Sequence, residues 1–298
     1  MVPTADHISV CICTYKRPNY LDRLLRALKD QTTEQLFTYS IVVVDNDHTQ
    51  SAIRTVETAQ KTSLTSIDYY HEPEQNIALA RNRAIANAKG NFVAFIDDDE
   101  FPVGNWLLSL YKAHKRFKAD GILGPVLPHY EVAPPKWIVR GKFYERTSHR
   151  TGEVLDWTNT RTGNVLLSRD IFIRKENLFR QEFGSGGEDK DFFRRMVAIG
   201  FRFVWSAEAP VYESVTPERY KRSFMLKRAL LRGKAPHFGH FDIVKSLVAI
   251  SLYSSALPVL FLLGHHRFMK YLIKDFDHIG RVLAFLGLNI IKQKYVMN

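Results

Sequence analysis

The sequence predicts an α/β fold with a largely parallel sheet. Two observations support this: short β-branched runs such as YSIVVVDND (39–47) recur through the first hundred residues, and segments with apolar residues at helical spacing lie between them. Alternating strand and helix signals are typical of βαβ units, whose central strands are buried on both faces.

The expected elements follow from these patterns in chain order. Helices are expected at 18–31, where four leucines share one face, at 51–62, and at 76–90, where alanines and isoleucines form a stripe and Gly90 is expected as the C-cap. Strands are expected at 7–15, 39–47, 66–73 and 91–100.

Composition limits the class of protein. The chain has 298 residues and is 45% hydrophobic, which allows one large domain or two modest ones with a substantial core. Cys11 and Cys13 lie two apart in an apolar strand, so we expect two buried thiols and a reducing compartment. The N-terminal segment has no basic stretch followed by an apolar run, so no secretory signal is expected.

The charge is concentrated near the C-terminus. Residues 1–199 contain 27 basic and 25 acidic residues (+2), whereas residues 200–298 contain 15 and 6 (+9), which together give the net charge of +11. A basic segment indicates a phosphate-bearing partner, such as nucleic acid, anionic lipid or a phosphorylated substrate. A solvated basic face is the alternative.

Polar residues follow three of the expected strands, in CTYKR (13–17), VDND (44–47) and IDDDE (96–100). In open α/β sheets, ligands bind beyond the carboxyl ends of the strands. Clustered carboxylates at such an edge are stabilised by a divalent cation, and Mg²⁺ or Mn²⁺ is typically completed by substrate phosphates. The sequence therefore predicts a metal–phosphate site there, with a solvated acidic turn as the alternative.

The chain has no GxGxxG after its first strand and no GxxxxGK[ST], which argues against dinucleotide-dependent oxidoreductases and P-loop NTPases. Phosphates would then be bound by metal and by cations. Arg17 follows the first strand, and Arg81 and Arg83 lie in the helix before the acidic strand. Arginine suits phosphate because its guanidinium is a bidentate fork, although each of these residues could instead be a surface charge.

Several blocks in combination resemble the family 2 glycosyltransferases of the GT-A fold. They are ISVCICTYKRPNYLDRLLRAL, VVVDND, NIALARNRAIANAKGNFVAFIDDDE and GGEDKDFFRRM, within residues 8–215. FIDDDEFPVGNWL, GILGPVLPHY, TGNVLLSRDIF and GGEDKDFF resemble, more closely, bacterial glucosyltransferases that extend lipid-linked repeat units of exopolysaccharides such as succinoglycan. The resemblance implies a Rossmann-like mixed sheet flanked by helices, with a C-terminal helical extension that could associate with a membrane.

The resemblance also implies roles for individual residues. The nucleotide base would be held by residues at the ends of the first two strands, and Arg81 would be a basic residue on the donor side. The DxD motif corresponds to Asp97-Asp98-Asp99, with Asp97 toward the ribose or uridine and Asp99 on the metal. The base-binding positions are Thr14, Tyr15, Arg17 and Asp45.

The family's ED pair corresponds to Glu188 and Asp189, with Asp189 as the catalytic base. The chemistry independently requires such a group, because an inverting sugar transfer needs a carboxylate to accept the proton of the attacking hydroxyl. The alternative is that these acids only stabilise the start of a helix. A further metal ligand at Glu213 is a weaker expectation.

The C-terminal region contains an uncharged run of 19 residues, 246–264, interrupted by Pro258 and diluted by serines. This length is just sufficient to span a bilayer. Three interpretations stay open: interfacial or re-entrant helices, a buried helix of a soluble or dimeric protein, and a transmembrane span.

Together these features predict three regions: a nucleotide-sugar-binding half (1–125), an acceptor-binding half (126–215) and a basic, apolar helical region (216–298).

The expected function is inverting, metal-dependent transfer of a hexose, with glucose expected, from a UDP-sugar to a lipid-linked oligosaccharide or other saccharide acceptor. The expected location is cytoplasmic, at the inner face of the cytoplasmic membrane, with peripheral membrane contact and no nucleic-acid partner. Oligomerisation is left open. Alternatives are another donor sugar (galactose, N-acetylhexosamine or a deoxysugar), a nucleotidyltransferase, and a non-catalytic basic membrane-binding module.

Overall fold

The computed structural model describes residues 6–174, 178–184, 186–232 and 240–288. The chain forms two compact units, one from residues 1–127 and 146–213 and the other from 128–145 and 214–298. The chain enters the second unit twice, within strand β7 (Val126–Tyr130) and within strand β10 (Val211–Val215), and it returns to the first unit after Glu145. The division at 125 and 215 that the sequence suggests stays a prediction.

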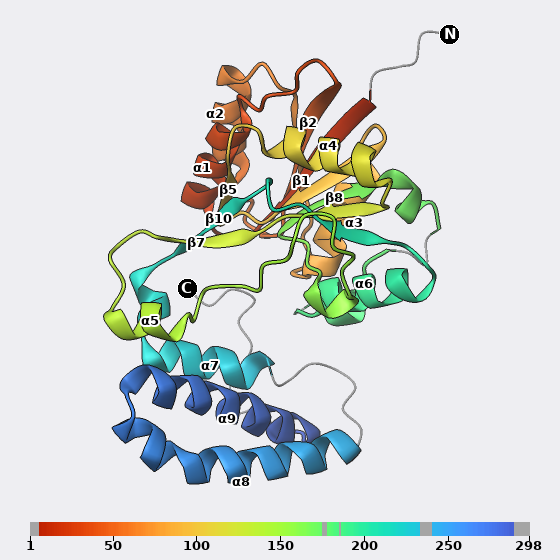
Figure 1. The fold of residues 1–298 in the computed structure, drawn as a ribbon. Coiled ribbons are helices and arrows are strands. Elements are labelled where there is room, and N and C mark those ends of the chain that lie inside the picture. The colour runs from red at the N-terminus through yellow and green to blue at the C-terminus, as the bar shows by residue number, and fades with distance from the viewer. Residues whose placement is uncertain (1–5, 175–177, 185, 233–239, 289–298) are drawn as a thin grey trace. The chain divides into compact units, whose positions relative to one another are not determined.

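The first unit is built on a seven-stranded mixed sheet of order β3-β2-β1-β4-β8-β6-β9 (Figure 1). The first four strands in this order are parallel, whereas β8 is antiparallel to both of its neighbours. The prediction of a mixed α/β sheet flanked by helices is therefore confirmed. The strands are β1 (Asp6–Thr14), β2 (Phe37–Asp45), β3 (Ile67–His71), β4 (Phe92–Ile96), β6 (Gly121–Leu123), β8 (Asn164–Ser168) and β9 (Phe203–Trp205).

Helices cover both faces of this sheet, and each face has its own apolar core. Alternate residues of β1 explain the two cores: Ile8, Val10 and Ile12 pack on one face, whereas Cys11 packs on the other. One core includes residues of α1 (Pro18–Leu28), α2 (Ile53–Thr62) and α4 (Trp106–Phe117); the other includes residues of α3 (Ile77–Asn87) and α6 (Glu188–Ala198). Short 3₁₀ turns are η1 (Trp157–Asn159), η2 (Arg169–Phe172), η4 (Gln181–Phe183) and, in the second unit, η5 (Pro217–Tyr220).

Two local predictions can be compared with the structure. Both cysteines are free thiols, and Cys11 is buried as expected, whereas Cys13 is only partly buried. Desolvation raises the pKa of Cys13 to about 12. The prediction that Gly90 caps α3 is wrong, because the helix ends at Asn87 and its C-cap is Ala88. Gly90 instead has φ +80° in the turn into β4, where an added Cβ would lie 2.6 Å from the carbonyl oxygen of His7.

The second unit is helical, as the sequence predicts for the C-terminal region. It contains α5 (Lys136–Gly141), α7 (Arg222–Arg232), α8 (His240–Leu262) and α9 (His265–Phe285). Its small core joins Ile138 to Val215, Tyr220 and Met225. Among the described helices, the segment Asp242–Leu262 is long and apolar enough to cross a membrane by length and composition, and 11% of it is buried. The basic run before α8 and the apolar stretch that follows α9 lie partly outside the described residues.

A buried asparagine joins the antiparallel strand β8 to its surroundings. The Asn164 side chain is fully buried, and its Oδ1 accepts a hydrogen bond from the Trp106 indole N–H at 2.8 Å. Its Nδ2 donates to the carbonyl oxygens of Pro125 (3.0 Å) and Ala209 (2.8 Å). The Pro125 carbonyl oxygen also accepts from the Val211 N–H (3.0 Å), so Asn164 is the partner on which the Trp106 N–H and the Ala209 carbonyl oxygen depend.

We therefore predict that Asn164→Leu lowers the free energy of unfolding by about 2–5 kcal/mol, because it leaves the Trp106 N–H donor and the Ala209 carbonyl acceptor unpaired in the core. Urea denaturation followed by tryptophan fluorescence would measure the change. Asn87→Ala, on the exposed surface of α3, is the matched control and should stay within about 1 kcal/mol of the parent. Equal stabilities for the Asn164→Leu variant and the parent would contradict this account.

Candidate active site

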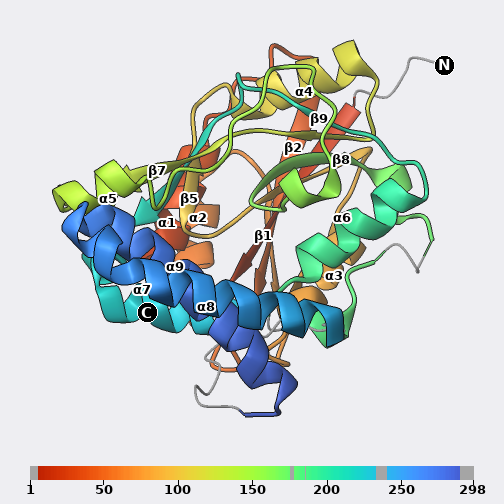
Figure 2. The same cartoon turned by 60° about the horizontal axis from the view of Figure 1, so that its bottom comes forward.

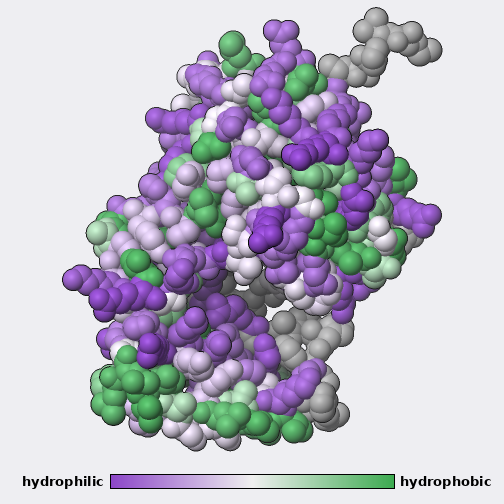
Figure 3. All heavy atoms as spheres, viewed as in Figure 1, coloured by the Kyte–Doolittle hydropathy of each residue, from purple (hydrophilic) through white to green (hydrophobic). Residues whose placement is uncertain are grey.

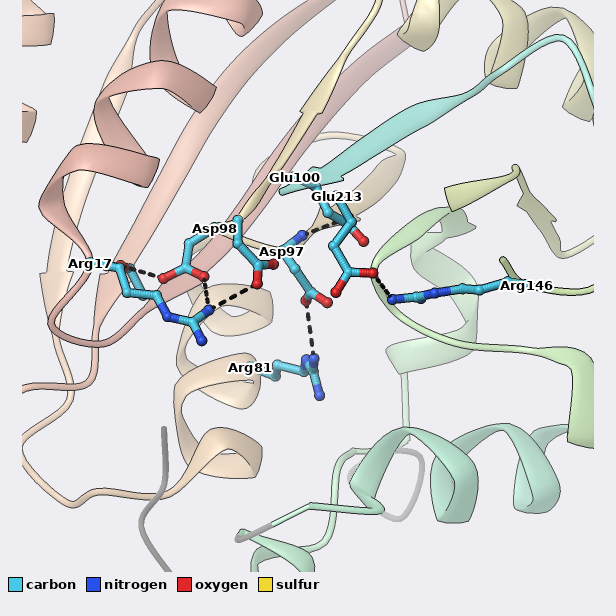
Figure 4. A network of polar contacts seen from close by, with 9 residues as sticks. Arg17, Arg81, Asp97, Asp98, Glu100, Arg146 and Glu213 are labelled. Carbon is cyan, nitrogen blue, oxygen red and sulfur yellow. Dashed lines mark hydrogen bonds and ion pairs between the residues drawn. The ribbon is translucent and has the colours of Figure 1, made fainter. Parts of the chain in front are cut away.

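The acids that follow β4 form a tight turn at the carboxyl edge of the sheet (Figure 4). The Glu100 N–H donates to the Asp97 carbonyl oxygen (3.1 Å), and the Asp97 N–H donates to Glu100 Oε2 (3.2 Å). The turn leads into strand β5 (Glu100–Pro102). Four consecutive carboxylates are therefore held in one place, and three arginines contact them or their immediate neighbours.

Arg17 and Thr14 bind the middle of this acid run. The Thr14 hydroxyl donates to Asp98 Oδ2 (2.8 Å), and Arg17 Nη1 donates to Asp98 Oδ1 (3.0 Å) and Asp99 Oδ2 (3.2 Å). Burial raises the pKa of Asp98 to about 6, even though Arg17 favours its charged form. The structure thus brings four of the predicted site residues into one network.

Arg81 of α3 joins the two acidic blocks that the sequence analysis identified. Its Nη2 lies 3.5 Å from Asp97 Oδ1, and its Nη1 forms an ion pair with Glu188, at the start of α6. Arg81 and Glu188 are buried, whereas the Asp97 side chain is 47% exposed. Burial raises the pKa of Asp97, and Arg81 opposes this shift. One guanidinium therefore connects segments 107 residues apart in the sequence.

Arg146 lies beside two further carboxylates, Glu100 and Glu213. Glu213 of β10 lies opposite Glu100 of β5 in an antiparallel pair, which places two like charges side by side. Arg146 forms an ion pair with Glu213 (Figure 4). Burial, and then Asp97, hold the pKa of Glu100 well above its usual range. Glu213 as a metal ligand stays a prediction, and the Arg146 contact was not anticipated from the sequence.

A glycine lets the chain approach these acids closely. An added Cβ at Gly163 would lie 2.7 Å from Glu100 Oε1 and 3.0 Å from Asp97 Oδ2. Burial, and then the charge of Arg146, lower the pKa of Arg161, which lies two residues earlier. The charges of Glu100 and Asp189 oppose this shift, so both acids lie near Arg161. The segment before β8 therefore contributes the positive charge of Arg161, and Gly163 leaves room for the side chains of Asp97 and Glu100.

The second acidic block begins α6, as predicted, but its three acids have different surroundings. Glu188 is buried against Arg81, and Asp191 is buried against Arg195, whose Nε lies 2.8 Å from Asp191 Oδ2. Asp189 is partly exposed, and among the described residues its carboxylate accepts a hydrogen bond from the Lys190 N–H (2.7 Å). Asp189 is thus the acid of this block that solvent can reach most freely.

Two asparagines, which the sequence analysis missed, connect the end of β2 and the start of α3 to η4, the short turn that precedes α6. Asn76 caps α3 by accepting from the N–H groups of Ala78 (3.0 Å) and Leu79 (3.2 Å), and its Nδ2 donates to the Gln181 carbonyl oxygen (3.0 Å). The Asn76 N–H in turn donates to Asn46 Oδ1 (2.9 Å), just after β2. An Asn directly before the alanine-rich helix is a recognisable N-cap signal.

Asp45 and Tyr15 are the remaining predicted residues of the nucleotide-base site, and Asp45 lies opposite Thr14 in the pairing of β1 with β2. Asp45 is fully buried, and its carboxylate accepts from the Asp47 N–H (3.0 Å), the Ala52 N–H (2.8 Å) and the Tyr69 hydroxyl (3.1 Å). Tyr15 is partly exposed, with Lys16 Nζ 5.2 Å from its ring centroid. Both assignments stay predictions.

The metal site also stays a prediction. Within the described ranges, no group of three or more His, Cys, Asp or Glu side chains is arranged to hold an ion. Asp99, the predicted ligand, contacts Arg17. Glu100 Oε1 is buried and has no hydrogen-bond partner in the described part of the chain.

Comparison with known proteins places this arrangement in a family. The sequence profile of glycosyl transferase family 2 matches residues 9–177. The chain is 33% identical over 300 residues to the succinoglycan biosynthesis protein ExoM of Rhizobium meliloti (strain 1021), covering 96% of this chain and 95% of that protein. It is 26% identical over 191 residues to the glycosyltransferase GlyA of Streptococcus pneumoniae serotype 4, covering 62% of this chain and 27% of GlyA.

Solved structures with the same fold include S. aureus TarS 1–349. Its complex with UDP aligns with a TM-score of 0.55 at 18% identity, covering 96% of this chain and 95% of that one. The complex with UDP-GlcNAc aligns with a TM-score of 0.56 at 16% identity, covering 94% and 92%. At these identities the likeness shows the shared fold.

The contacts of Asn76 lead to a prediction about how the segment that precedes α6 is attached to α3. Asn76→Ala should lower the free energy of unfolding by about 1–2 kcal/mol, because it removes the cap of α3. Asn76→Asp keeps the capping oxygen but places a carboxylate near the Gln181 carbonyl oxygen. It should therefore cost less stability, yet speed amide hydrogen exchange in residues 181–184 and 188–190.

Asn19→Ala, exposed in the first turn of α1, is the control and should change neither measurement. If Asn76→Asp left exchange in both stretches at the parent rate, the proposed link between α3 and α6 would be wrong.

Proposed function

The chain belongs to glycosyl transferase family 2, and from this premise we propose that it transfers a hexose, with inversion, from a UDP-sugar to a lipid-linked oligosaccharide. Glucose is the proposed sugar, and the product is an intermediate of an exopolysaccharide or surface polysaccharide. The proposed place of action is the cytoplasmic face of the cytoplasmic membrane. The match to a succinoglycan biosynthesis protein over nearly the whole chain supports the pathway class.

The observation that carries this proposal is the pairing of Arg81 with Asp97 and Glu188. A sugar transfer needs one acidic site where the departing nucleoside diphosphate is stabilised and another where the acceptor hydroxyl loses its proton. Arg81 links the end of β4 to the start of α6, so both acidic blocks border the same region of the first unit. A nucleotidyltransferase would need paired acids but not the second block.

We propose the following division of roles on the donor side. Thr14, Tyr15, Arg17 and Asp45 bind the nucleotide, with Asp97 and Asp98 toward the uridine and Arg81 toward the diphosphate. Asp99 would be the protein ligand of Mg²⁺ or Mn²⁺. When bound, such an ion would supply Lewis-acid stabilisation of the departing diphosphate.

The residues present fit a hard divalent ion. All the side-chain donors are carboxylate oxygens, Asp97 is half exposed, and the buried Glu100 Oε1 lacks a hydrogen-bond partner among the described residues. Magnesium is usually held by one or two carboxylates together with substrate phosphates, so three preformed protein ligands are not required.

On the acceptor side we propose Asp189 as the base. It is partly exposed, unlike Glu188 and Asp191, which are buried in ion pairs with arginines. A carboxylate that accepts a proton from a sugar hydroxyl must reach the bound substrate. Glu188 would act by holding Arg81, and hence by positioning the donor-side cation, rather than by accepting the proton itself.

The function is tested by measuring UDP release from UDP-glucose, UDP-galactose and UDP-N-acetylglucosamine, with and without an oligosaccharide lipid acceptor. We expect slow release from one donor with Mn²⁺ alone, faster release with the acceptor, and loss of activity in EDTA. UDP with Mn²⁺ should also raise the melting temperature, because a ligand that binds the native state stabilises it.

Asp99→Ala should abolish the metal-dependent part of this shift. Glu34→Ala, an exposed acid in a loop, is the control and should retain it. Equal UDP binding in EDTA and in Mn²⁺ would refute the metal proposal. Absence of UDP release from every donor would favour a non-catalytic module.

The base assignment has its own test. Asp189→Asn keeps the shape of the side chain but cannot accept the proton, so turnover should fall by about 10²–10⁴-fold while donor binding persists. Initial rates and donor titration would separate the two effects. Asp170→Asn, another exposed acid in the first turn of a short helix, should leave both unchanged. Near-normal turnover of the Asp189→Asn variant would assign the role to another acid.

A further inference from the structure

Helix α8 of the second unit has apolar side chains on its outside and polar side chains toward its neighbour. Among its described side chains, 242–262, only Ile243 and Ser246 are buried. Leu252, Phe261 and Leu262 are 65%, 60% and 84% exposed. This distribution is the reverse of that expected for a helix on a water-soluble surface, because exposing apolar area to water is unfavourable.

Polar contacts determine which side of α8 packs against α9. Ser246 is fully buried, and its hydroxyl lies 3.2 Å from His278 Nδ1. The Ser254 hydroxyl donates to Oδ2 of the buried Asp275 (3.0 Å). The two helices lie side by side in both ribbon views (Figures 1 and 2). Ser246 and Ser254 thus face α9, whereas the hydroxyls of Ser251 and Ser255 donate to carbonyl oxygens of α8 itself. The side of α8 away from α9 exposes most of its leucines and valines.

Most exposed apolar residues of α8 recur at spacings of three, four and seven, which places them on one side of the helix. They share this side with exposed Ser251 and Ser255, and Phe261 lies at its edge. Figure 3 shows hydrophobic side chains gathered where α8 lies. Lys245 borders this face, since it lines an apolar groove together with Val248 and Leu252. We call this set the α8 stripe: Val244, Leu247, Val248, Leu252, Val259, Phe261 and Leu262.

Exposed basic residues accompany the α8 stripe within the same unit. On α9, Arg267, Lys270 and Lys274 are exposed and spaced three and four apart, so they share one face. A stripe of apolar side chains with exposed lysine and arginine beside it matches the chemistry of an anionic lipid surface, which offers acyl chains and phosphates together.

We propose that the α8 stripe is a membrane-contact surface, on which α8 lies in the plane of an anionic phospholipid bilayer with its apolar side chains among the upper acyl chains. The proposal rests on the membrane location proposed above and deepens it by naming the surface and its orientation. It requires no sugar transfer, so its test uses vesicles without substrates.

The packing of α9 distinguishes a helix lying in the plane from one that spans the bilayer. α9 packs along α8 and contains six charged residues: Arg267, Lys270, Lys274, Asp275, Asp277 and Arg281. If α8 crossed the membrane with this partner attached, those charges would enter the hydrocarbon region, which is strongly unfavourable. An orientation in the plane buries the α8 stripe and leaves the charges of α9 at the headgroups or in water.

The first experiment measures sedimentation of the full chain with phosphatidylcholine vesicles and with vesicles that contain 30% phosphatidylglycerol. We expect binding to the anionic vesicles that weakens in high salt. Leu252→Glu should reduce the partition coefficient at least about tenfold, because it replaces an apolar side chain that would enter the bilayer with a charged one. Leu64→Glu, at a fully exposed leucine of the first unit, is the matched control and should bind like the parent.

The charge contribution is tested in the same assay. The double substitution Lys270→Glu and Lys274→Glu should weaken binding to anionic vesicles and reduce its salt dependence. Lys61→Glu, exposed on α2, should have little effect. Binding that is equal on neutral and anionic vesicles would refute the basic half of the proposal.

The second experiment measures depth. Fluorophores on Val244→Cys, Leu252→Cys and Leu262→Cys, each in a Cys11→Ser and Cys13→Ser background, are quenched by lipids brominated at different depths. A helix in the plane should give three similar shallow depths. In a spanning helix the outer two sites would lie about 27 Å apart along the axis, and Leu252 alone would be deep. That pattern would overturn the proposal.

Two other occupants of the α8 stripe give different results. If a second copy of the chain covers it, the parent should be a dimer that Leu252→Glu dissociates, without vesicle binding. If the first unit covers it, labels on α8 should be protected from aqueous quenchers in the absence of vesicles. Either result would refute the membrane proposal, whereas failure of the UDP-release assay alone would not affect it.

Discussion

The repulsion among the acids that follow β4 is the constraint on which the first unit depends. Asp97 to Glu100 are consecutive carboxylates, and Asp98, Asp99 and Glu100 are buried. Leaving one such charge unpaired in the interior costs several kcal/mol. Arg17, Arg81 and Arg146 supply the opposing charge, to the acids themselves or, for Arg146, to the adjoining Glu213. They come from three distant parts of the chain, so neutralising the acids also brings those parts together.

The same kind of pairing distinguishes acids held in buried ion pairs from an acid that solvent can reach. Glu188 and Asp191 are occupied by Arg81 and Arg195, and their neighbour Asp189 stays partly exposed. The three acids of this helical turn thus differ in their ability to accept a proton, because a carboxylate in a buried ion pair is a poor proton acceptor. The favourable interaction of acids with a helix N-terminus holds for all three, but it does not account for this difference.

Local pattern was enough to predict β1 to β4 and α1 to α3, since each is apolar at the spacing of its own secondary structure. The helix α4 and the short strands β5, β6 and β9 were not predicted. The convergence of residues at 14–17 and 96–100 followed from the rule that parallel strands end at one edge. Pairing order could not be predicted: the sequence contains no signal that β8 lies antiparallel beside β4, or that Arg146 reaches Glu213, 67 residues away. The Asn76 cap did have a sequence signal, and the assignment of Gly90 as a cap missed the true helix end by two residues.

The helical unit is not a detachable tail, because it is assembled from two separate stretches of the chain. Ile138, from the stretch 128–145, is fully buried with Val215, Tyr220 and Met225 from the stretch after residue 214. Removing only the C-terminal residues would leave α5 with its apolar face uncovered, and adding them to another enzyme would omit their partner. A single crossover in the gene would therefore separate α5 from the residues that cover it, and could neither add the helical unit to another protein nor remove it cleanly.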